Sequence, residues 1–204
     1  MENNIEIKNV VVETSEFYGP AGWGREPITM ELQIPGKTIG QIFPHQDNKI
    51  SVTAFDGDKP IGHCNANEWE YFLEKFIINL DNLKENEHEG TKIFVKLLQK
   101  VYDVEKNKLL LFLLGKGFEI KKISHNCGIM VISSYGKKGI GKRMVINADE
   151  ILKKNGYLVN IVETTNYNSM KAFKDNGYEI FASFNLKDNM INVDDTYSVM
   201  YKIF

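Results

Sequence analysis

The sequence is short of several features that would assign it quickly to a class of protein. It holds only 2 cysteines in 204 residues. Cys64 and Cys127 lie far apart without CxxC spacing, which argues against a disulfide framework and against a zinc site. The net charge of −2 argues against the global positive field that nucleic-acid-binding proteins use. We therefore expect reduced thiols, no metal and no nucleic-acid partner.

Long hydrophobic runs are also missing. The most apolar stretch, LLLFLLGKGF from Leu109, is far too short to cross a bilayer. The N-terminal MENNIEIKNV lacks the basic start and the apolar run of a signal peptide. A chain of this length with 43% hydrophobic residues suits one medium-sized domain with a substantial core. We expect a soluble, cytoplasmic protein without a membrane partner, whose residues 1–204 form a single domain.

The hydrophobic pattern predicts an α/β (α+β) architecture. Alternating or β-branched runs predict strands near residues 5–12, 126–134, 157–164, 179–186 and 195–204, with a hairpin over residues 49–66 that turns at Gly57. Apolar residues at helical spacing between 67 and about 122 predict a helical insertion between the third and fourth strands. Two further helices are expected, from the loop at 136 to about Asn155 and from Asn166 to Asn176. The predicted layout is a mixed central sheet with helices on both faces.

A glycine-rich, cationic loop, YGKKGIGKRM from Tyr135, connects a predicted buried strand to a helix. Backbone amides at a helix N-terminus form an anion site, and glycine lets a phosphate approach them. The loop differs from a P-loop because Arg143 stands where Ser or Thr would hold magnesium. It differs from a dinucleotide loop because Met144 replaces the third glycine. Taken alone, the loop is equally typical of a strand-to-helix turn with solvated lysines.

Two motifs together resemble the acetyl-CoA-binding core of the GNAT N-acetyltransferase superfamily. The first motif, Gln/Arg-x-x-Gly-x-Gly/Ala, is present as Gly136-x-x-Gly139-x-Gly141, where Lys137 or Lys138 would supply the missing leading cation. The second motif, Asn-x-x-Ser/Ala-x-x-x-Tyr/Phe-x-x-x-Gly-Phe, is present as Asn166, Ser169, Phe173, Gly177 and Tyr178. The resemblance implies the GNAT fold, acetyl-CoA as cofactor and transfer of an acetyl group to an amine.

The same resemblance implies a set of cofactor contacts. The strand before the loop would splay from its neighbour and pair its amides with the pantetheine arm, and the loop amides would hold the pyrophosphate. Asn166 would bond the pantetheine chain. Phe173 stands where the family often has a Tyr that reprotonates the CoA thiolate, and it can pack against the cofactor but cannot donate a proton. The implied contact residues are Ile129, Met130, Val131, Gly136, Lys137, Lys138, Gly139, Ile140, Gly141, Lys142, Asn166 and Phe173.

An early segment points to a subfamily. EFYGPAGWGREPITMEL from Glu16 is similar to the Glu-Pro-containing segment of insect-type arylalkylamine N-acetyltransferases, and the long helical insertion is similar to theirs. In that family the Glu of this pair acts as general base through waters. Glu26 would hold that role, assisted by the hydroxyls of Thr165 and Ser169. The simpler alternatives are an exposed loop carboxylate and two helix-capping hydroxyls.

An apolar wall around Glu26 would raise its pKa toward the range that a base needs. Phe17 and Trp23 are the candidates for such a wall.

His125 is the alternative base. It precedes Cys127 by two residues, so both side chains face the same side of a strand. Some vertebrate arylalkylamine acetyltransferases place histidines on this strand for proton relay, whereas a histidine bonded to backbone is the simpler interpretation. The other histidines show no metal-ligand spacing.

The sequence therefore predicts an acetyl-CoA-dependent N-acetyltransferase, acting as a monomer or homodimer by direct attack of a small primary amine on the thioester. An arylalkylamine is the first expectation for the substrate, ahead of a polyamine, an amino sugar or a peptide amine. The alternative from another class is a catalytically silent CoA-binding module with the same fold.

Overall fold

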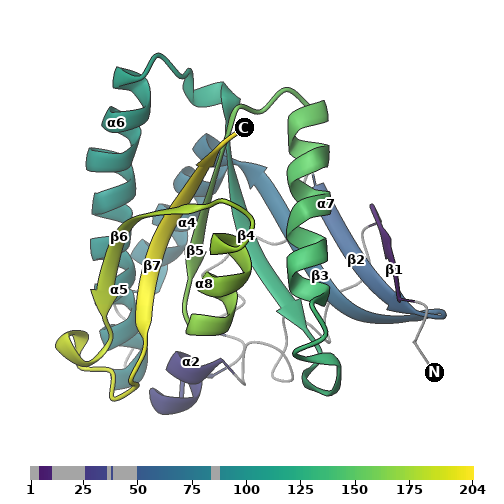
Figure 1. Ribbon diagram of the computed structural model, residues 1–204. Helices are drawn as coiled ribbons and strands as arrows, with labels where there is room; N and C mark the ends of the chain where they lie inside the picture. Colours follow the sequence, from purple (N-terminus) through teal and green to yellow (C-terminus); the bar gives the residue numbers. More distant parts are fainter. Residues whose placement is uncertain (1–4, 11–25, 36–37, 39–49, 84–87) are drawn as a thin grey trace.

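The computed structural model describes residues 5–10, 26–35, 38, 50–83 and 88–204. They form one seven-stranded sheet with the strand order β1-β2-β3-β4-β5-β7-β6 (Figure 1). β4 and β5 pair in parallel and every other neighbouring pair is antiparallel. The strands are β1 (Ile5–Lys8), β2 (Ile50–Asp56), β3 (Lys59–Glu68), β4 (Ile123–Val131), β5 (Val159–Thr164), β6 (Glu179–Asn185) and β7 (Thr196–Ile203).

The strands follow the predicted pattern with shifted ends. The hairpin of β2 and β3 turns at Gly57, whose φ of 60° lies in the left-handed region that the Asp-Gly pair favours. β1 ends at Lys8, so it is shorter than the predicted strand, and residues 11 and 12 lie outside the described residues. β4 begins three residues before Asn126, because Ser124 and His125 pair with the end of β3.

Helices cover both faces of the sheet, as predicted (Figure 1). One face carries α7 (Ile140–Lys154) and α8 (Tyr167–Lys174). The other carries α4 (Trp69–Leu83), α5 (Glu89–Val104), the π-helix η2 (Glu105–Leu109) and α6 (Leu110–Gly115). Short 3₁₀ helices occur at η3 (Ile120–Lys122), η4 (Ser133–Tyr135) and η5 (Lys187–Asn189). The short helix α2 (Pro27–Glu31) lies below α8 in the view of Figure 1, at the end of the sheet toward which β4 and β5 run.

The helices from α4 to α6 form the predicted insertion between β3 and β4. Trp69, Phe72 and Phe76 on α4 and Phe94 and Leu98 on α5 are buried in one core with residues of β4, β5 and β7. The helical spacing of these residues puts them on one face of each helix. Truncation of a fully buried Phe to Ala in such a core costs about 3–5 kcal/mol. None of the described helices has the length and apolar character that crossing a membrane requires.

A buried polar network ties α7 and the end of the second motif to the sheet. The Tyr178 hydroxyl donates to Asp149 Oδ1 on α7 at 2.6 Å and accepts from Asn160 Nδ2 on β5 at 2.7 Å. Lys202 Nζ on β7 donates to Asp149 Oδ2 at 2.7 Å. Since a buried polar group is expensive without partners, these bonds fix where α7 sits over the sheet.

The parallel strands β4 and β5 separate toward their carboxyl ends. They pair only as far as Asn126 and Val162, although β4 continues to Val131 and β5 to Thr164. From Cys127 onward β4 keeps β3 as its partner and loses β5. The splay implied by the family resemblance is therefore present, and within the described ranges it leaves a row of β4 backbone groups without a strand on that side.

Candidate active site

The junction between β4 and α7 presents free backbone amides. Its loop passes through left-handed conformations at Lys137 (φ 62°) and Gly139 (φ 72°), and Gly139 is the N-cap of α7. No described side chain caps this end of the helix. The amides of Ile140, Gly141 and Lys142 precede the first intrahelical bond, from the Arg143 amide to the Gly139 carbonyl. Their amides and the helix dipole together fit an anion such as a pyrophosphate.

The residues of this loop make different contacts with their surroundings. A Cβ on Gly141 would lie 3.5 Å from Ile129 Cδ1, so the start of α7 packs directly against the unpaired end of β4. Arg143 points elsewhere, because its Nη2 donates to the carbonyl of Ile5 on β1 at 3.0 Å. Lys138 Nζ lies 5.0 Å from the ring centroid of Tyr135. Lys138 therefore stays beside Tyr135 at the junction, whereas Arg143 is directed toward β1.

The junction between β5 and α8 is closed by its own side chains. Asn166 Oδ1 accepts from the Ser169 amide at 3.0 Å, and Ser169 Oγ donates to the Asn166 carbonyl at 3.0 Å. Asp195 Oδ2 accepts from the Tyr167 amide at 3.0 Å. Asn166 therefore caps α8, and the Ser169 hydroxyl bonds within the same turn; such a capping bond is compatible with a catalytic role for Ser169.

Phe173 of the second motif lies in the protein core. Its side chain is fully buried, and its ring meets that of Tyr178 edge-on at a centroid distance of 5.0 Å. The helix α8 ends at Lys174 rather than Asn176, and Gly177 follows with the predicted positive φ, 84°. These contacts explain the second motif largely as packing and capping.

Glu26 lies at the N-cap of α2, beside the end of β5. Its Oε2 accepts from the amides of Ile28 at 3.0 Å and Thr29 at 3.1 Å, and Pro27 occupies the first helical position, where no amide is needed. The residue is half-buried, yet Oε1 is shut off from solvent and accepts no well-formed hydrogen bond from the described residues. The Thr165 hydroxyl approaches closely enough to affect the carboxyl group.

This environment changes the acidity of Glu26. Burial raises its pKa from 4.5 to about 7, against the opposing effects of the Thr165 hydroxyl and the amides of Thr29 and Ile28. The negative charge of Asp195 raises the pKa further. Phe17 and Trp23, the predicted apolar wall, lie outside the described residues. A carboxyl group with a pKa near neutrality exchanges a proton at physiological pH, as a general base must.

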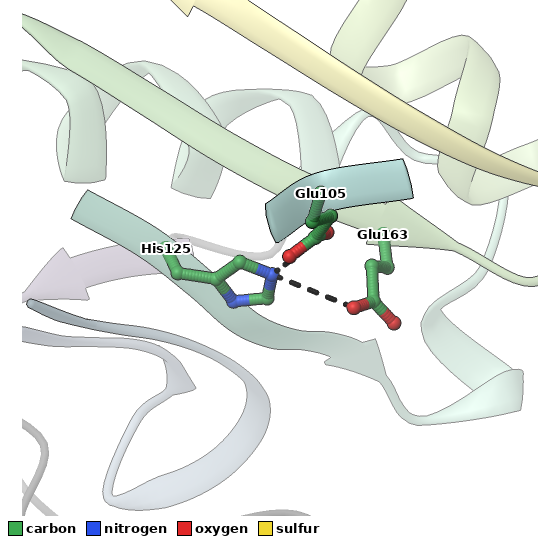
Figure 2. A group of neighbouring side chains, drawn as sticks. All are labelled: Glu105, His125 and Glu163. Atoms are coloured by element: carbon green, nitrogen blue, oxygen red, sulfur yellow. Dashed lines mark ion pairs between the residues drawn. The ribbon is translucent and has the colours of Figure 1, made fainter. Parts of the chain in front are cut away.

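His125 lies in a buried cluster with two carboxylates, those of Glu105 and Glu163 (Figure 2). Its Nε2 is 3.6 Å from Glu105 Oε1 and 3.7 Å from Glu163 Oε1. Burial by itself lowers the pKa of His125, but the carboxylate of Glu105, with smaller contributions from Cys127 and Glu163, raises it well above its usual value. Burial and the charge of Glu163 raise the pKa of Glu105 to about 7. The His125 side chain is buried and is directed into the core.

Comparison with known proteins identifies the family. Residues 11–178 match the Acetyltransferase (GNAT) family. The chain belongs to this family. It is therefore an N-acetyltransferase, and its cofactor is acetyl-CoA, which fits the free amides of α7 and the unpaired edge of β4. No curated protein sequence matches this GNAT chain.

Solved structures show the same GNAT fold at low sequence identity. Arylalkylamine N-acetyltransferase 2 from Aedes aegypti superposes with a TM-score of 0.71 at 20% identity, covering 98% of this chain and 99% of that one. Agmatine N-acetyltransferase gives a TM-score of 0.69 at 12% identity, covering 98% and 100%. Polyamine N-acetyltransferase from Drosophila melanogaster, which forms N-acetylagmatine, gives 0.63 at 11% identity, also covering 98% and 100%.

Glu105 and Tyr197 are the site residues that sequence reasoning missed. Glu105 follows Leu98 and Val101 at helical spacing and precedes Leu109, so the pattern of the insertion already placed a carboxylate on a buried face. A charged residue on such a face is rare unless it has a partner. Tyr197 donates its hydroxyl to Glu163 Oε2, and nothing in its alternating strand distinguishes it from a core aromatic residue.

Proposed function

We propose that this GNAT enzyme acetylates a small primary amine and that Glu26 removes the proton of the amine. The observation that carries the proposal is a carboxyl group shielded from solvent, with a pKa of about 7, beside Thr165. Thr165 directly follows β5, so Glu26 lies at the edge of the sheet where β4 and β5 separate. A base in that place is next to the slot that the unpaired end of β4 offers to the thioester arm.

Each residue then has a separate task. Acetyl-CoA supplies the thioester that the amine attacks. The amides of Ile140, Gly141 and Lys142 would hold its pyrophosphate. The unpaired backbone of Ile129, Met130 and Val131 would pair with the pantetheine amides, as a further strand would. Gly136 and Gly139 keep the loop backbone open, with Lys137 and Lys138 beside it. Glu26 accepts the proton that the ammonium group loses, because only the neutral amine is a nucleophile.

Two other groups are poor candidates for the chemistry. His125 directs its Nε2 at two carboxylates in the core rather than at the separating strands, so we do not assign it the role of base. Burial raises the pKa of the Cys64 thiol to about 12, so a thiolate nucleophile is not available there. Direct attack of the amine therefore needs no covalent intermediate on the enzyme.

A positively charged substrate suits the surroundings of Glu26. Asp195 lies near enough to Glu26 for its charge to raise the pKa of that carboxyl group, and two carboxylates attract an ammonium ion. The structurally similar enzymes bear names that refer to arylalkylamines, agmatine and polyamines. We propose an arylalkylamine as the first substrate and agmatine or a polyamine as the next. Both cysteines are free and buried, which suits a reducing compartment, so we propose a cytoplasmic location.

A thiol-release assay over a panel of amines tests this function. We expect release of CoA with at least one arylalkylamine or polyamine. A thermal shift with acetyl-CoA serves as the control, because binding to the native state raises the apparent stability. A thermal shift without turnover of any amine would favour the alternative, a silent CoA-binding module. Phe173, which offers no proton donor at its position, is the observation in favour of that alternative. No shift at saturating acetyl-CoA would contradict both.

A further inference from the structure

Three buried side chains from three separate elements converge on one point (Figure 2). Glu105 begins the π-helix η2, His125 lies in β4 and Glu163 lies in β5. One ligand atom of each, a ring nitrogen or a carboxylate oxygen, lies within 4.8 Å of the other two. The side chains of Glu105 and His125 are 1% and 2% exposed, and that of Glu163 is 7% exposed. Single π-helical turns of this kind occur frequently at functional sites.

The outer atoms of the cluster are held in place by aromatic residues. Trp69 Nε1 donates to Glu105 Oε2 at 3.3 Å, and the Tyr197 hydroxyl donates to Glu163 Oε2. The ring of Phe72 stacks on the His125 ring at a centroid distance of 3.7 Å and an angle of 9°. Each carboxylate therefore uses one oxygen for a hydrogen bond and turns the other toward Nε2. Hydrogen bonds that orient the ligating groups from outside are a regular feature of metal sites.

The inner atoms contact one another at distances longer than hydrogen bonds. Glu105 Oε1, His125 Nε2 and Glu163 Oε1 make no hydrogen bond within the part of the chain that the structure describes. The separations from Nε2 of 3.6 and 3.7 Å exceed the range of about 2.7–3.2 Å for an N–H···O bond. Two ligands that each lie about 2.1 Å from a zinc ion are about 3.4–3.6 Å apart at tetrahedral to trigonal angles. The two separations from Nε2 are close to those of ligands to a common ion.

The charge of the cluster leads to the same conclusion. Two carboxylates exceed the one positive charge that the imidazole can carry, and an excess of buried negative charge is expensive. A divalent cation neutralises both while the imidazole stays neutral and ligates through Nε2. One imidazole with two carboxylates suits a first-row transition metal such as zinc better than magnesium or calcium, which prefer oxygen ligands alone.

We propose that Glu105, His125 and Glu163 bind one divalent transition-metal ion, which joins the helical insertion to the two separating strands. The sequence predicted no metal, because the three ligands come from segments with no common spacing and meet only in the fold. The proposal is independent of the amine substrate and of the role of Glu26.

Titration of the full-length chain with Zn²⁺ after treatment with a chelator tests the proposal. We expect one equivalent of Zn²⁺ per chain by isothermal titration calorimetry, and a higher melting temperature with the ion than without it. Glu105→Gln and His125→Gln each remove a ligand, so both should weaken binding at least tenfold. Glu119→Gln changes an exposed carboxylate of the same insertion and should leave the affinity for zinc unchanged.

Tyr197→Phe provides a second test if loss of a ligand impairs folding. This variant keeps the ring and removes the hydrogen bond to Glu163 Oε2, so we expect an affinity about 10–100-fold lower, as for other outer groups of metal sites. The proposal is overturned if the wild-type chain binds no zinc. It is equally overturned if binding occurs but is insensitive to Glu105→Gln, His125→Gln and Tyr197→Phe, since that ion would lie on the surface. A failure to turn over any amine would leave the zinc titration unaffected, so the two proposals fail separately.

Discussion

Two strand-to-helix junctions lie side by side at the carboxyl ends of β4 and β5, and they treat their backbone amides in opposite ways. The first junction leaves the amides of Ile140, Gly141 and Lys142 without a side-chain cap. The second closes its amides with Asn166 and Asp195. The same local geometry therefore gives an open anion site in one place and a finished helix end in the other. The difference lies in the cap residue, glycine against asparagine.

We propose that the two junctions serve different parts of the reaction. In the proposed function, the open junction would attract the anionic part of the cofactor, whereas the closed junction positions Thr165 next to Glu26. A helix end whose first amides are already hydrogen-bonded to side chains would be a poor phosphate site.

The largest expected effect concerns Glu26, in the part of the site where the amine would bind. Glu26→Gln removes the base, so we expect the turnover number to fall by about 10²–10⁴-fold while the Kd for acetyl-CoA stays the same. Wild-type kcat/KM should rise about tenfold per pH unit below about pH 7 and level off above it, because only the ionised carboxylate accepts a proton. Steady-state kinetics with calorimetry measure both.

Glu31→Gln, on the exposed face of the same helix α2, is the matched control and should behave like the wild type. Equal turnover of Glu26→Gln and wild type would assign the base to water.

The second effect is a dependence of stability on pH. Glu26 has a pKa of about 7 in the folded chain against 4.5 as its ordinary value, so the folded state holds this proton longer than the unfolded state. Wild-type stability therefore falls between about pH 4.5 and pH 7 through this group. Relative to the wild type, the free energy of unfolding of Glu26→Gln should rise by about 3 kcal/mol from about pH 4.5 to pH 8.

Urea denaturation at both pH values gives this difference. A difference between variant and wild type that stays constant with pH would show that Glu26 titrates alike in the folded and unfolded states.

The third effect tests directly whether the two junctions differ in their ability to bind a phosphate. Gly141→Asp puts a carboxylate at the second position of α7, where it favours the helix dipole but repels a phosphate. We expect the Kd for acetyl-CoA to rise at least tenfold, about 1.4 kcal/mol, without loss of melting temperature. Its Cβ meets only ordinary contacts, 3.5 Å and longer.

Asn168→Asp makes the same kind of change at the second position of α8 and is the control. We expect no change in the Kd for acetyl-CoA, since the closed junction holds no phosphate. A comparable loss of affinity from both variants would refute the division between the junctions.

The smallest effect sharpens the account of the second motif. Asn166→Ala removes the cap of α8 and should lower the free energy of unfolding by about 1 kcal/mol. If Asn166 serves mainly as a cap, the Kd for acetyl-CoA should change by less than about threefold. A much larger loss of affinity at unchanged stability would instead favour the hydrogen bond to pantetheine that the family resemblance implies. Denaturation and calorimetry on the same variant distinguish the two outcomes.

The sequence by itself determined the order of the strands along the chain, the insertion and the two junctions. These features rest on local patterns: alternation in β7, helical spacing of Trp69 and Phe72, and a glycine at the one helix start that must stay open. The family motifs likewise lie within short segments. Glu26 was identified as a candidate through the resemblance of the segment around it to a known subfamily.

Only the tertiary structure decided what surrounds these residues. The pKa of Glu26 depends on its burial beside Thr165, which lies far away in the sequence. His125 was predicted as an alternative base, and its position between Glu105 and Glu163 followed from the packing of η2 against β4 and β5. The physical reason is that spacing fixes which face a side chain occupies, whereas desolvation and charge depend on the groups that other segments bring to it.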